Sequence, residues 1–265
     1  MLKLSLLGYP HITLNGRRIT GFITSKAEAV IYYLAVTGRV QGRVALAGLL
    51  WPDVPDSVAR KNLRDILPNL RQLFGDYLIT TRDTATLDFA QGIWLDVNRF
   101  RTVLTNAATV PLDALQSAVD LYQDEFLAGF YTRQAPSYET WVLQEREALR
   151  VLLLRGLQQL SKRYIADGAY EAALAVNRRH LAIEPWDEEI HRLQMALLAL
   201  SGQRGAALRQ YENCCRILDV ELGVAPLPET AALYSALSTE YAPHLLLDTL
   251  QRPSTTAAHY TGIFA

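Results

Sequence analysis

The spacing of apolar residues divides the chain into a short β-rich start and a long helical remainder. Over residues 2–20 apolar and polar residues alternate, as around Leu2 and Leu4. A period of two places one face of a strand on a core, so we predict short antiparallel strands here. Asn15 and Gly16 follow the second alternating run, and because both tolerate positive φ they predict a two-residue hairpin turn.

Helical spacing begins at residue 25. Ser25 and Glu28 have the spacing of a capping box, in which the hydroxyl and the carboxylate satisfy free amides of the first turn, and Gly38 is placed to end that helix. The elements predicted before residue 90 are helices at 25–37, about 44–50 and about 56–74, and a hairpin at 77–89 with Arg82 near its tip. Strands, three helices and a hairpin in this order predict a winged helix-turn-helix with an extra N-terminal sheet.

The predicted helix at 56–74 has one apolar side and one cationic side. At 100° per residue, its leucines, Ile66 and Phe74 fall on one arc of the helix. The opposite arc carries Arg60, Lys61, Arg64, Asp65 and Arg71, with Asn62 and Asn69 just beyond. Arg, Lys and Asn bind phosphate oxygens and base edges, and the second helix of a helix-turn-helix enters the major groove. We therefore predict that this helix contacts DNA.

The sequence from residue 97 to about 241 is helical in pattern. Helices are expected at 97–107, 111–123, 137–166, 169–183, 187–201, 204–219 and 228–241. This region contains a repeat of 34 residues, which separates Gly168 from Gly202 and Ala173 from Ala207. That period, with small residues at the helix crossing, is the tetratricopeptide signature. Two units are too few to be stable alone, so we expect the preceding helices to cap them.

The net charge of −1 is unevenly distributed. Residues 1–90 hold 11 Lys and Arg against 7 Asp and Glu, whereas residues 91–265 hold 15 against 20. A basic front and an acidic rear fit a polyanion-binding domain joined to a domain with another task. The N-terminus lacks the apolar run of a signal peptide, and no apolar segment approaches the ~18 residues that span a bilayer. We therefore expect a cytoplasmic protein with no membrane partner.

No arrangement of residues typical of an enzyme stands out. There is no Ser/His/Asp, Cys/His or paired-carboxylate pattern and no GxxxxGK[ST] phosphate loop. The adjacent Cys214 and Cys215 lack the spacing of a redox or metal motif, so we expect reduced thiols. Four residues could be drawn as a metal site: His180, Glu184, Glu188 and His191. Helix caps and packing between the repeats explain these residues better. We expect no catalytic residue, no cofactor and no metal.

Six segments carry a family resemblance when read in order. They are AGLLWPD (47–53), ARKNLR (59–64) leading to NLR (69–71), WLDVNRF (94–100), LYQDEFLAGF (121–130), ETWVLQERE (139–147) and ELGVAPLPET (221–230). Each is weak alone, but together they resemble the SARP family, the Streptomyces antibiotic regulatory proteins. These proteins pair a DNA-binding domain like that of OmpR and PhoB with a bacterial transcriptional activator domain.

The resemblance implies a sequence-specific DNA-binding regulator that activates transcription. Family members bind direct repeats near a promoter as side-by-side protomers and contact RNA polymerase. The implied partners are therefore double-stranded DNA, RNA polymerase and further copies of the chain. Helix 56–74 becomes the recognition helix and 77–89 the wing. The loop around 51–55 lies where the OmpR-like fold carries its polymerase-contacting turn.

The predicted DNA-binding residues come from the recognition helix, the wing and two helix starts. At a helix start the free amides and the helix dipole also favour an anion. These residues are Arg60, Lys61, Asn62, Arg64, Arg71, Arg82, Arg43 and Lys26.

Pro68 departs from the family pattern, which carries a residue compatible with a continuous helix at this position. Proline has no amide for the carbonyl of Arg64, and its ring crowds that turn. Either the helix kinks at Pro68, or it ends near Leu67 and restarts with Pro68 in a first turn. Both alternatives leave open whether Arg71 points into the same groove as Arg60 and Arg64.

The predicted fold is mainly α with a small N-terminal β component: a winged helix-turn-helix followed by an all-α, tetratricopeptide-like helical domain. We assign residues 1–92 to the DNA-binding domain, 93–241 to the bacterial transcriptional activator domain and 242–265 to a tail or linker. The alternative function is a tetratricopeptide-like protein-interaction adaptor whose winged helix has lost DNA binding. Pro68 and the near-neutral net charge are its support.

Overall fold

The computed structural model describes residues 1–239, 246 and 249. The chain forms two compact units, residues 1–106 with 113–153 and residues 107–112 with 154–265. The fold is mainly α, and every strand of the described residues lies in the first unit, which confirms the predicted fold class. Among the described helices, none has the length and apolar character needed to span a membrane. The predicted tail at 242–265 and the last residues of the helix predicted at 228–241 fall almost entirely outside the described residues.

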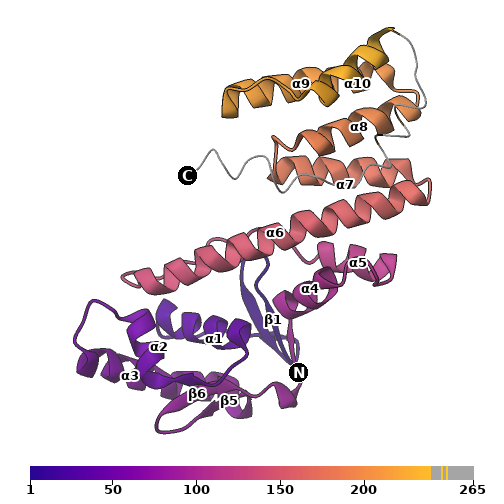
Figure 1. The fold of residues 1–265 in the computed structure, drawn as a ribbon. Helices are drawn as coiled ribbons and strands as arrows, with labels where there is room; N and C mark the ends of the chain where they lie inside the picture. The colour runs from indigo at the N-terminus through magenta and orange to yellow at the C-terminus, as the bar shows by residue number, and fades with distance from the viewer. Residues whose placement is uncertain (240–245, 247–248, 250–265) are drawn as a thin grey trace. The chain divides into compact units, whose positions relative to one another are not determined.

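The first unit contains the predicted winged helix-turn-helix (Figure 1). Its elements are β1 (Leu2–Ser5), β2 (His11–Leu14), β3 (Arg17–Arg18), α1 (Ser25–Thr37), β4 (Gln41–Gly42), α2 (Arg43–Leu50), α3 (Asp56–Phe74), η1 (Gly75–Tyr77), β5 (Leu78–Thr80), β6 (Thr84–Leu87), η2 (Phe89–Gln91) and β7 (Ile93–Leu95). The same unit continues into α4 (Asp96–Thr105), α5 (Leu112–Val119) and the start of α6 (Pro136–Ala166).

The N-terminal sheet has the strand order β3-β2-β1-β7. Leu2 and Leu4 are buried on one face, as their alternation predicts. The hairpin turn between β2 and β3 is confirmed, because Asn15 and Gly16 have φ of 50° and 81°. Strand β7 was not predicted. It pairs in parallel with β1 and brings the end of the winged helix beside the first residues of the chain.

The cap of α1 differs from the predicted capping box. Thr24, not Ser25, is the N-cap residue, and its hydroxyl accepts a hydrogen bond of 3.1 Å from the amide of Ala27. Glu28 instead accepts a bond of 2.5 Å from the hydroxyl of the buried Tyr32. A Thr one residue upstream of a Ser offers the same chemistry, so the sequence pattern misplaced the cap by one residue.

Helix α5 is shorter than the predicted helix at 111–123. It ends at Val119 because the segment that follows bonds to main-chain carbonyls just beyond β1. The amide of Gln123 donates to the carbonyl of Leu7 at 3.1 Å, and the amide of Leu127 donates to that of Leu6 at 2.9 Å. These tertiary partners replace the bonds that further helix would have made.

Asp96 is the first residue of α4, and its side chain joins this helix to the chain just after β1. Its buried carboxylate accepts bonds from the amides of Leu6 at 2.6 Å, Leu7 at 2.8 Å and Val97 at 2.7 Å. Burial raises the pKa of Asp96, and the three amide donors together with the charge of His11 oppose that shift. The carboxylate therefore fixes the chain at the point where β1 ends and α4 begins.

The second unit is a stack of antiparallel helices. After the second part of α6 come α7 (Tyr170–Ile183), α8 (Glu188–Leu200), α9 (Arg204–Leu222) and α10 (Pro228–Thr239). Gly168 and Gly202 are left-handed turn residues with φ of 72° and 75°, and Ala173 and Ala207 are fully buried at equivalent positions. The 34-residue repeat is therefore a pair of helical hairpins sharing one apolar core. Burial in α9 raises the pKa of the Cys214 thiol to about 12.

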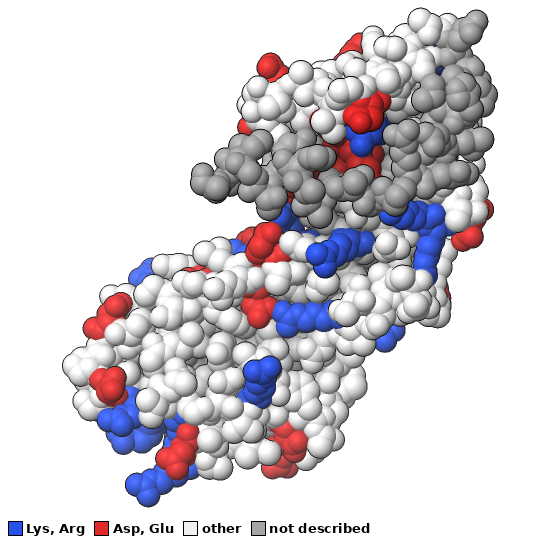
Figure 2. Space-filling model, in the orientation of Figure 1, with Lys and Arg blue, Asp and Glu red and all other residues white. Residues whose placement is uncertain are grey.

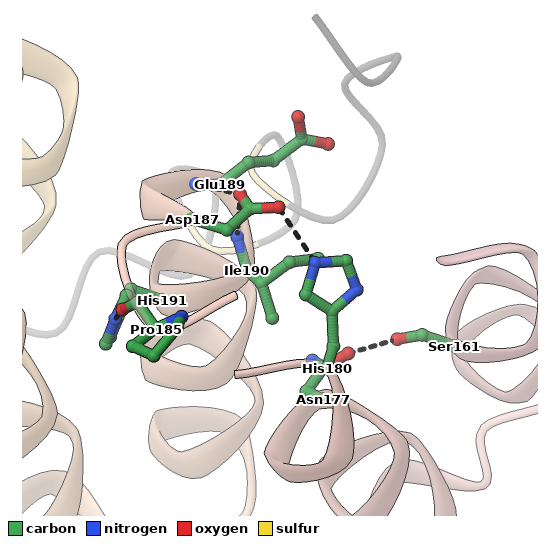
Figure 3. A network of polar contacts seen from close by, with 8 residues as sticks. All are labelled: Ser161, Asn177, His180, Pro185, Asp187, Glu189, Ile190 and His191. Carbon is green, nitrogen blue, oxygen red and sulfur yellow. Dashed lines mark hydrogen bonds and ion pairs between the residues drawn. The ribbon is translucent and has the colours of Figure 1, made fainter. Parts of the chain in front are cut away.

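A buried polar network links α6, α7 and α8 (Figure 3). His180 Nε2 lies 2.9 Å from Asp187 Oδ2, and the other carboxylate oxygen of Asp187 accepts from the first amides of α8. Ser161 donates a bond of 2.7 Å to Asn177. His191 points away from His180 and contacts the carbonyl of Pro185 at 2.8 Å. His180 therefore joins α7 to the cap of α8, whereas His191 joins α8 to the α7–α8 connection and, through a contact of 2.7 Å with Gln210, to α9.

Acid is expected to destabilise the second unit through His191. Burial lowers the pKa of His191 below its ordinary value of 6.5, although the Pro185 carbonyl, Asp187 and Glu188 oppose the shift. Because the folded chain favours the neutral ring, its stabilisation is complete above about pH 6.5 and is lost as pH falls from there to the lower folded pKa. We expect wild-type stability to fall with a slope of at most about 1.4 kcal/mol per pH unit from this group.

Urea unfolding at pH 7.5 and pH 5.5 measures this loss in the wild-type chain and in His191→Gln. The variant keeps an amide donor near the Pro185 carbonyl but has no ring to titrate. Its stability should fall less between the two pH values. An equal fall in both proteins would show that His191 does not cause the acid sensitivity.

Candidate nucleic-acid interface

Helix α3 is amphipathic and continuous. Its apolar side is buried against the rest of the first unit through Ala59, Leu63, Ile66, Leu67, Leu70 and Phe74. The helix runs from Asp56 to Phe74 with Pro68 inside it, so the alternative in which it ends near Leu67 and restarts is wrong. The buried side fixes the rotation of α3 and directs the opposite side, with its basic residues, to solvent.

The first half of α3 presents three exposed basic residues. Arg60 and Arg64 are exposed, and neither forms an ion pair or side-chain hydrogen bond within the described residues. Lys61 lies 3.4 Å from Asp65, one turn further along, with both side chains more than half exposed. Such an exposed pair is weak and can exchange for an outside anion. Asn62 is half-buried at the edge of this face.

The wing is tied to the second half of α3 through Arg71. The Arg71 Nε donates a bond of 2.7 Å to the hydroxyl of Thr80 in β5. Sequence reasoning did not single out Thr80, and only contact with the hairpin reveals it. Arg71 therefore points to the end of β5, beside the tip of the wing, and it lies about three turns along α3 from Arg60.

Arg82 is exposed at the tip of the wing. The Thr81 hydroxyl accepts the amides of Asp83 at 3.2 Å and Thr84 at 3.0 Å, so the turn that carries Arg82 is locally fixed. β5 and β6 pair in antiparallel register, with Thr80 opposite Ala85, and β4 extends the sheet on the far side of β6. The predicted hairpin with Arg82 near its tip is thus present in the structure.

Arg43 lies near Arg71 and the tip of the wing. Its main-chain amide donates a bond of 2.8 Å to the carbonyl of Asp83, which joins the start of α2 to the tip of the wing. The Arg43 Nε is buried and has no hydrogen-bond partner in the described part of the chain. Burial and the nearby charge of Arg71 lower the pKa of Arg43, and Asp83 opposes the shift. The structure therefore brings Arg43 and Arg71 together.

Lys26 makes its contacts at the other end of α2 from Arg43. Its ammonium donates to the carbonyl of Leu50 at 2.5 Å and to that of Gln134 at 3.0 Å, and it lies 5.1 Å from the centre of the Trp51 ring. Burial lowers the pKa of Lys26, with Asp53 opposing the shift. These contacts commit its charge to the carboxyl end of α2, where a cation also favours the helix dipole.

Asn69 is a further polar residue of α3 with a structural task. Its side chain accepts a bond of 3.3 Å from the amide of Ile23 and donates one of 3.1 Å to the carbonyl of Gly21. Both partners lie in the segment before α1. Asn69 therefore anchors that segment, and no sequence signal distinguished it from the outward-facing residues beside it.

The surface over α3 and the wing is basic but mixed. Figure 2 shows Lys and Arg side chains at the lower left, where Figure 1 places α3 and the β5–β6 hairpin, with acidic side chains among them. In α3 itself, Arg60, Lys61, Arg64 and Arg71 outnumber Asp56 and Asp65. This surface can attract a polyanion, while its carboxylates can accept hydrogen bonds from base amino groups.

The family is shown by the part of the chain that follows the winged helix. The profile of the bacterial transcriptional activator domain matches residues 95–238, more than half of the chain. The chain is 28% identical over 211 residues to the regulatory protein AfsR of Streptomyces griseus, an alignment that covers 73% of this chain and 20% of AfsR. The chain therefore spans about a fifth of the length of this relative.

A second relative matches over most of both chains. The transcriptional regulatory protein MoaR1 of Mycobacterium tuberculosis is 22% identical over 243 residues, which is 88% of this chain and 78% of MoaR1. Among solved structures, Mycobacterium tuberculosis EmbR in complex with a low-affinity phosphopeptide aligns with a TM-score of 0.70 and 22% identity, over 94% of this chain and 68% of EmbR. At that identity the likeness shows the fold.

Together, the match over residues 95–238 and the regulatory relatives confirm the resemblance read from the six segments. This chain belongs to the bacterial transcriptional activator domain family, and it is similar to regulators of the SARP type.

Proposed function

We propose that the chain is a sequence-specific DNA-binding activator that places α3 in the major groove of promoter DNA. The observation that carries this proposal is the exposed cationic half of α3, where Arg60 and Arg64 have no intramolecular carboxylate partner within the described residues. These two arginines can therefore bind phosphates and base edges without breaking an internal ion pair. Lys61, Asn62 and the wing residue Arg82 extend the same contact surface.

Arg43 and Arg71 would bind phosphate beside the wing. Their like charges lie close together, and the Arg43 Nε has no partner within the described residues, so an anion placed between them would relieve repulsion and fill an open donor. Arg71 would also hold the wing in place through Thr80. Lys26 was predicted as a DNA contact from sequence, but its ammonium already serves two carbonyls, so we assign it the smallest share of binding.

Activation would use contacts outside the groove. We place the polymerase contact in the loop at 51–55, where Pro52 and Asp53 are exposed and Lys26 lies against the Trp51 ring. The chain would bind direct repeats as side-by-side protomers, with residues 1–92 on DNA and 93–241 supporting contacts between protomers or with RNA polymerase. The adaptor alternative depended on Pro68 and on the near-neutral net charge. Because α3 continues through Pro68 and carries exposed basic residues despite that net charge, we do not favour it.

Selection of random duplexes with the purified chain tests the proposal. We expect an enriched motif that contains a direct repeat, with its halves about one helical turn apart because each protomer must present α3 to the same face of the duplex. Binding should weaken steeply as salt rises, since phosphate contacts release counterions. No enrichment of any sequence at low salt would reject DNA binding, and an inverted repeat would reject tandem protomers.

A further inference from the structure

Pro68 is exposed at the centre of the outward side of α3. At 100° per residue it lies within about 20° of Lys61, two turns earlier, and between Arg64 and Asp65 on the preceding turn. The buried residues of α3 occupy the opposite side. Pro68 is therefore an apolar residue on a face that is mostly charged or polar.

The fold gains nothing from a proline at this position. Proline removes the amide that would bond to the carbonyl of Arg64, and it crowds the preceding turn. An exposed ring buries too little surface to offset that loss by packing. A helix residue that breaks a local rule without a structural gain points to a task outside the fold.

The chemistry of the ring restricts what that task can be. Proline has no side-chain donor, acceptor or charge, so it cannot bind phosphate or read a base by hydrogen bonding. In the major groove the apolar feature of the base edges is the C5-methyl group of thymine. A rigid ring directly on the backbone also loses no rotamer freedom when it makes such a contact.

We infer that Pro68 is a specificity-determining residue that contacts the C5-methyl group of a thymine in the binding site. The inference rests on the proposed function. Pro68 lies ~6 Å along the helix axis from Arg64, which corresponds to roughly two base-pair steps. The thymine should therefore lie about two base pairs from the base that Arg64 contacts.

Replacement of each thymine of the selected duplex by deoxyuridine tests the inference, because uracil lacks only the methyl group. For the wild-type chain we expect the Kd to rise about fourfold at one position, the value of one buried methyl. For Pro68→Ala, which keeps only the Cβ methyl, the ratio of the two Kd values at that position should be smaller than in the wild-type chain. The ratio is measured within each protein, so a general change in affinity cancels.

Two controls separate a contact made by Pro68 from an effect on folding and from an effect of any exposed residue of α3. Pro68→Ala restores the missing amide, so its Tm should rise by about 5 °C and a loss of fold cannot explain its behaviour. Gln72→Ala changes another exposed residue one turn further along α3 and should keep the full uracil effect.

Three results would overturn the inference. They are a selected motif without thymine, a wild-type chain that is insensitive to uracil at every position, and a Pro68→Ala variant with the same uracil effect as wild type. Each of these can occur while the chain binds DNA normally, so the proposed function would stand. Absence of binding to every duplex would instead reject the proposed function and the inference with it.

Discussion

The double replacement Arg60→Ala with Arg64→Ala is expected to abolish specific DNA binding while leaving the fold intact. Both side chains are exposed and make no ion pair or side-chain hydrogen bond within the described residues, so their removal costs the folded state little. Loss of a base-contacting arginine costs about 1–3 kcal/mol, which is roughly 5- to 150-fold in Kd for each residue. Fluorescence anisotropy with the selected duplex measures the change.

Arg99→Ala is the matched control for charge. Arg99 is an exposed arginine of α4 in the same unit, and it has no ion pair or side-chain hydrogen bond among the described residues. Its removal takes the same charge from the chain, so it should change the Kd less than twofold. If the control weakened binding as much as either replacement in α3, net charge and not the face of α3 would account for affinity.

The single variants separate the two kinds of contact. A base-contacting arginine, when removed, should relax the preference at one base pair, whereas a phosphate-contacting arginine should weaken all sequences alike and flatten the dependence on salt. We expect Arg64→Ala to change sequence preference, because Arg64 lies nearer the centre of the outward face than Arg60. Unchanged binding of both single variants and of the double variant would reject this interface.

Asp96→Ala is expected to unfold or severely destabilise the first unit. The replacement leaves the amides of Leu6, Leu7 and Val97 buried without an acceptor. Each stranded donor costs about 1–3 kcal/mol, so the total loss from the three should be ~3–9 kcal/mol, a large part of the stability of a domain. Urea unfolding followed by far-UV circular dichroism measures the loss.

Asp96→Asn and Asp88→Ala calibrate that effect. The asparagine variant keeps one carbonyl oxygen for the pair of amides at Leu6 and Leu7, so its loss should be smaller than that of alanine. Asp88 caps the short helix η2 through two exposed bonds, from the amide of Ala90 at 3.1 Å and from the side chain of Gln91 at 3.3 Å, and its removal should cost about 1 kcal/mol. A loss of about 1 kcal/mol for Asp96→Ala would show that the amides find other acceptors.

Local signals predicted the winged helix well. The period of two at Leu2 and Leu4, the Asn15-Gly16 turn and the apolar arc of α3 each depend on neighbours in sequence, and all three are present. The glycine turns at Gly168 and Gly202 are of the same kind. Where a short stretch of residues decides the structure, the pattern was sufficient.

Long-range partners explain the features that sequence reasoning missed. Strand β7 pairs with β1 about 90 residues away, and α5 stops at Val119 because Leu6 and Leu7 offer acceptors to the segment beyond it. In the candidate site, the contact of Arg71 with Thr80 and the commitment of Lys26 to Leu50 also depend on elements distant in the chain. A helix wheel gives the direction of a side chain and not its partner.

The parallel pairing of β1 with β7 has consequences for synthesis of the chain and for the choice of a fragment boundary. During synthesis β1 leaves the ribosome before β7, so one edge of β1 stays open until residue 95 emerges. A nascent or cleaved chain that stops at residue 92 lacks β7 and the carboxylate of Asp96, so it exposes an unpaired strand edge of the kind that templates aggregation. A soluble fragment made to test DNA binding by the winged helix should therefore extend beyond Asp96.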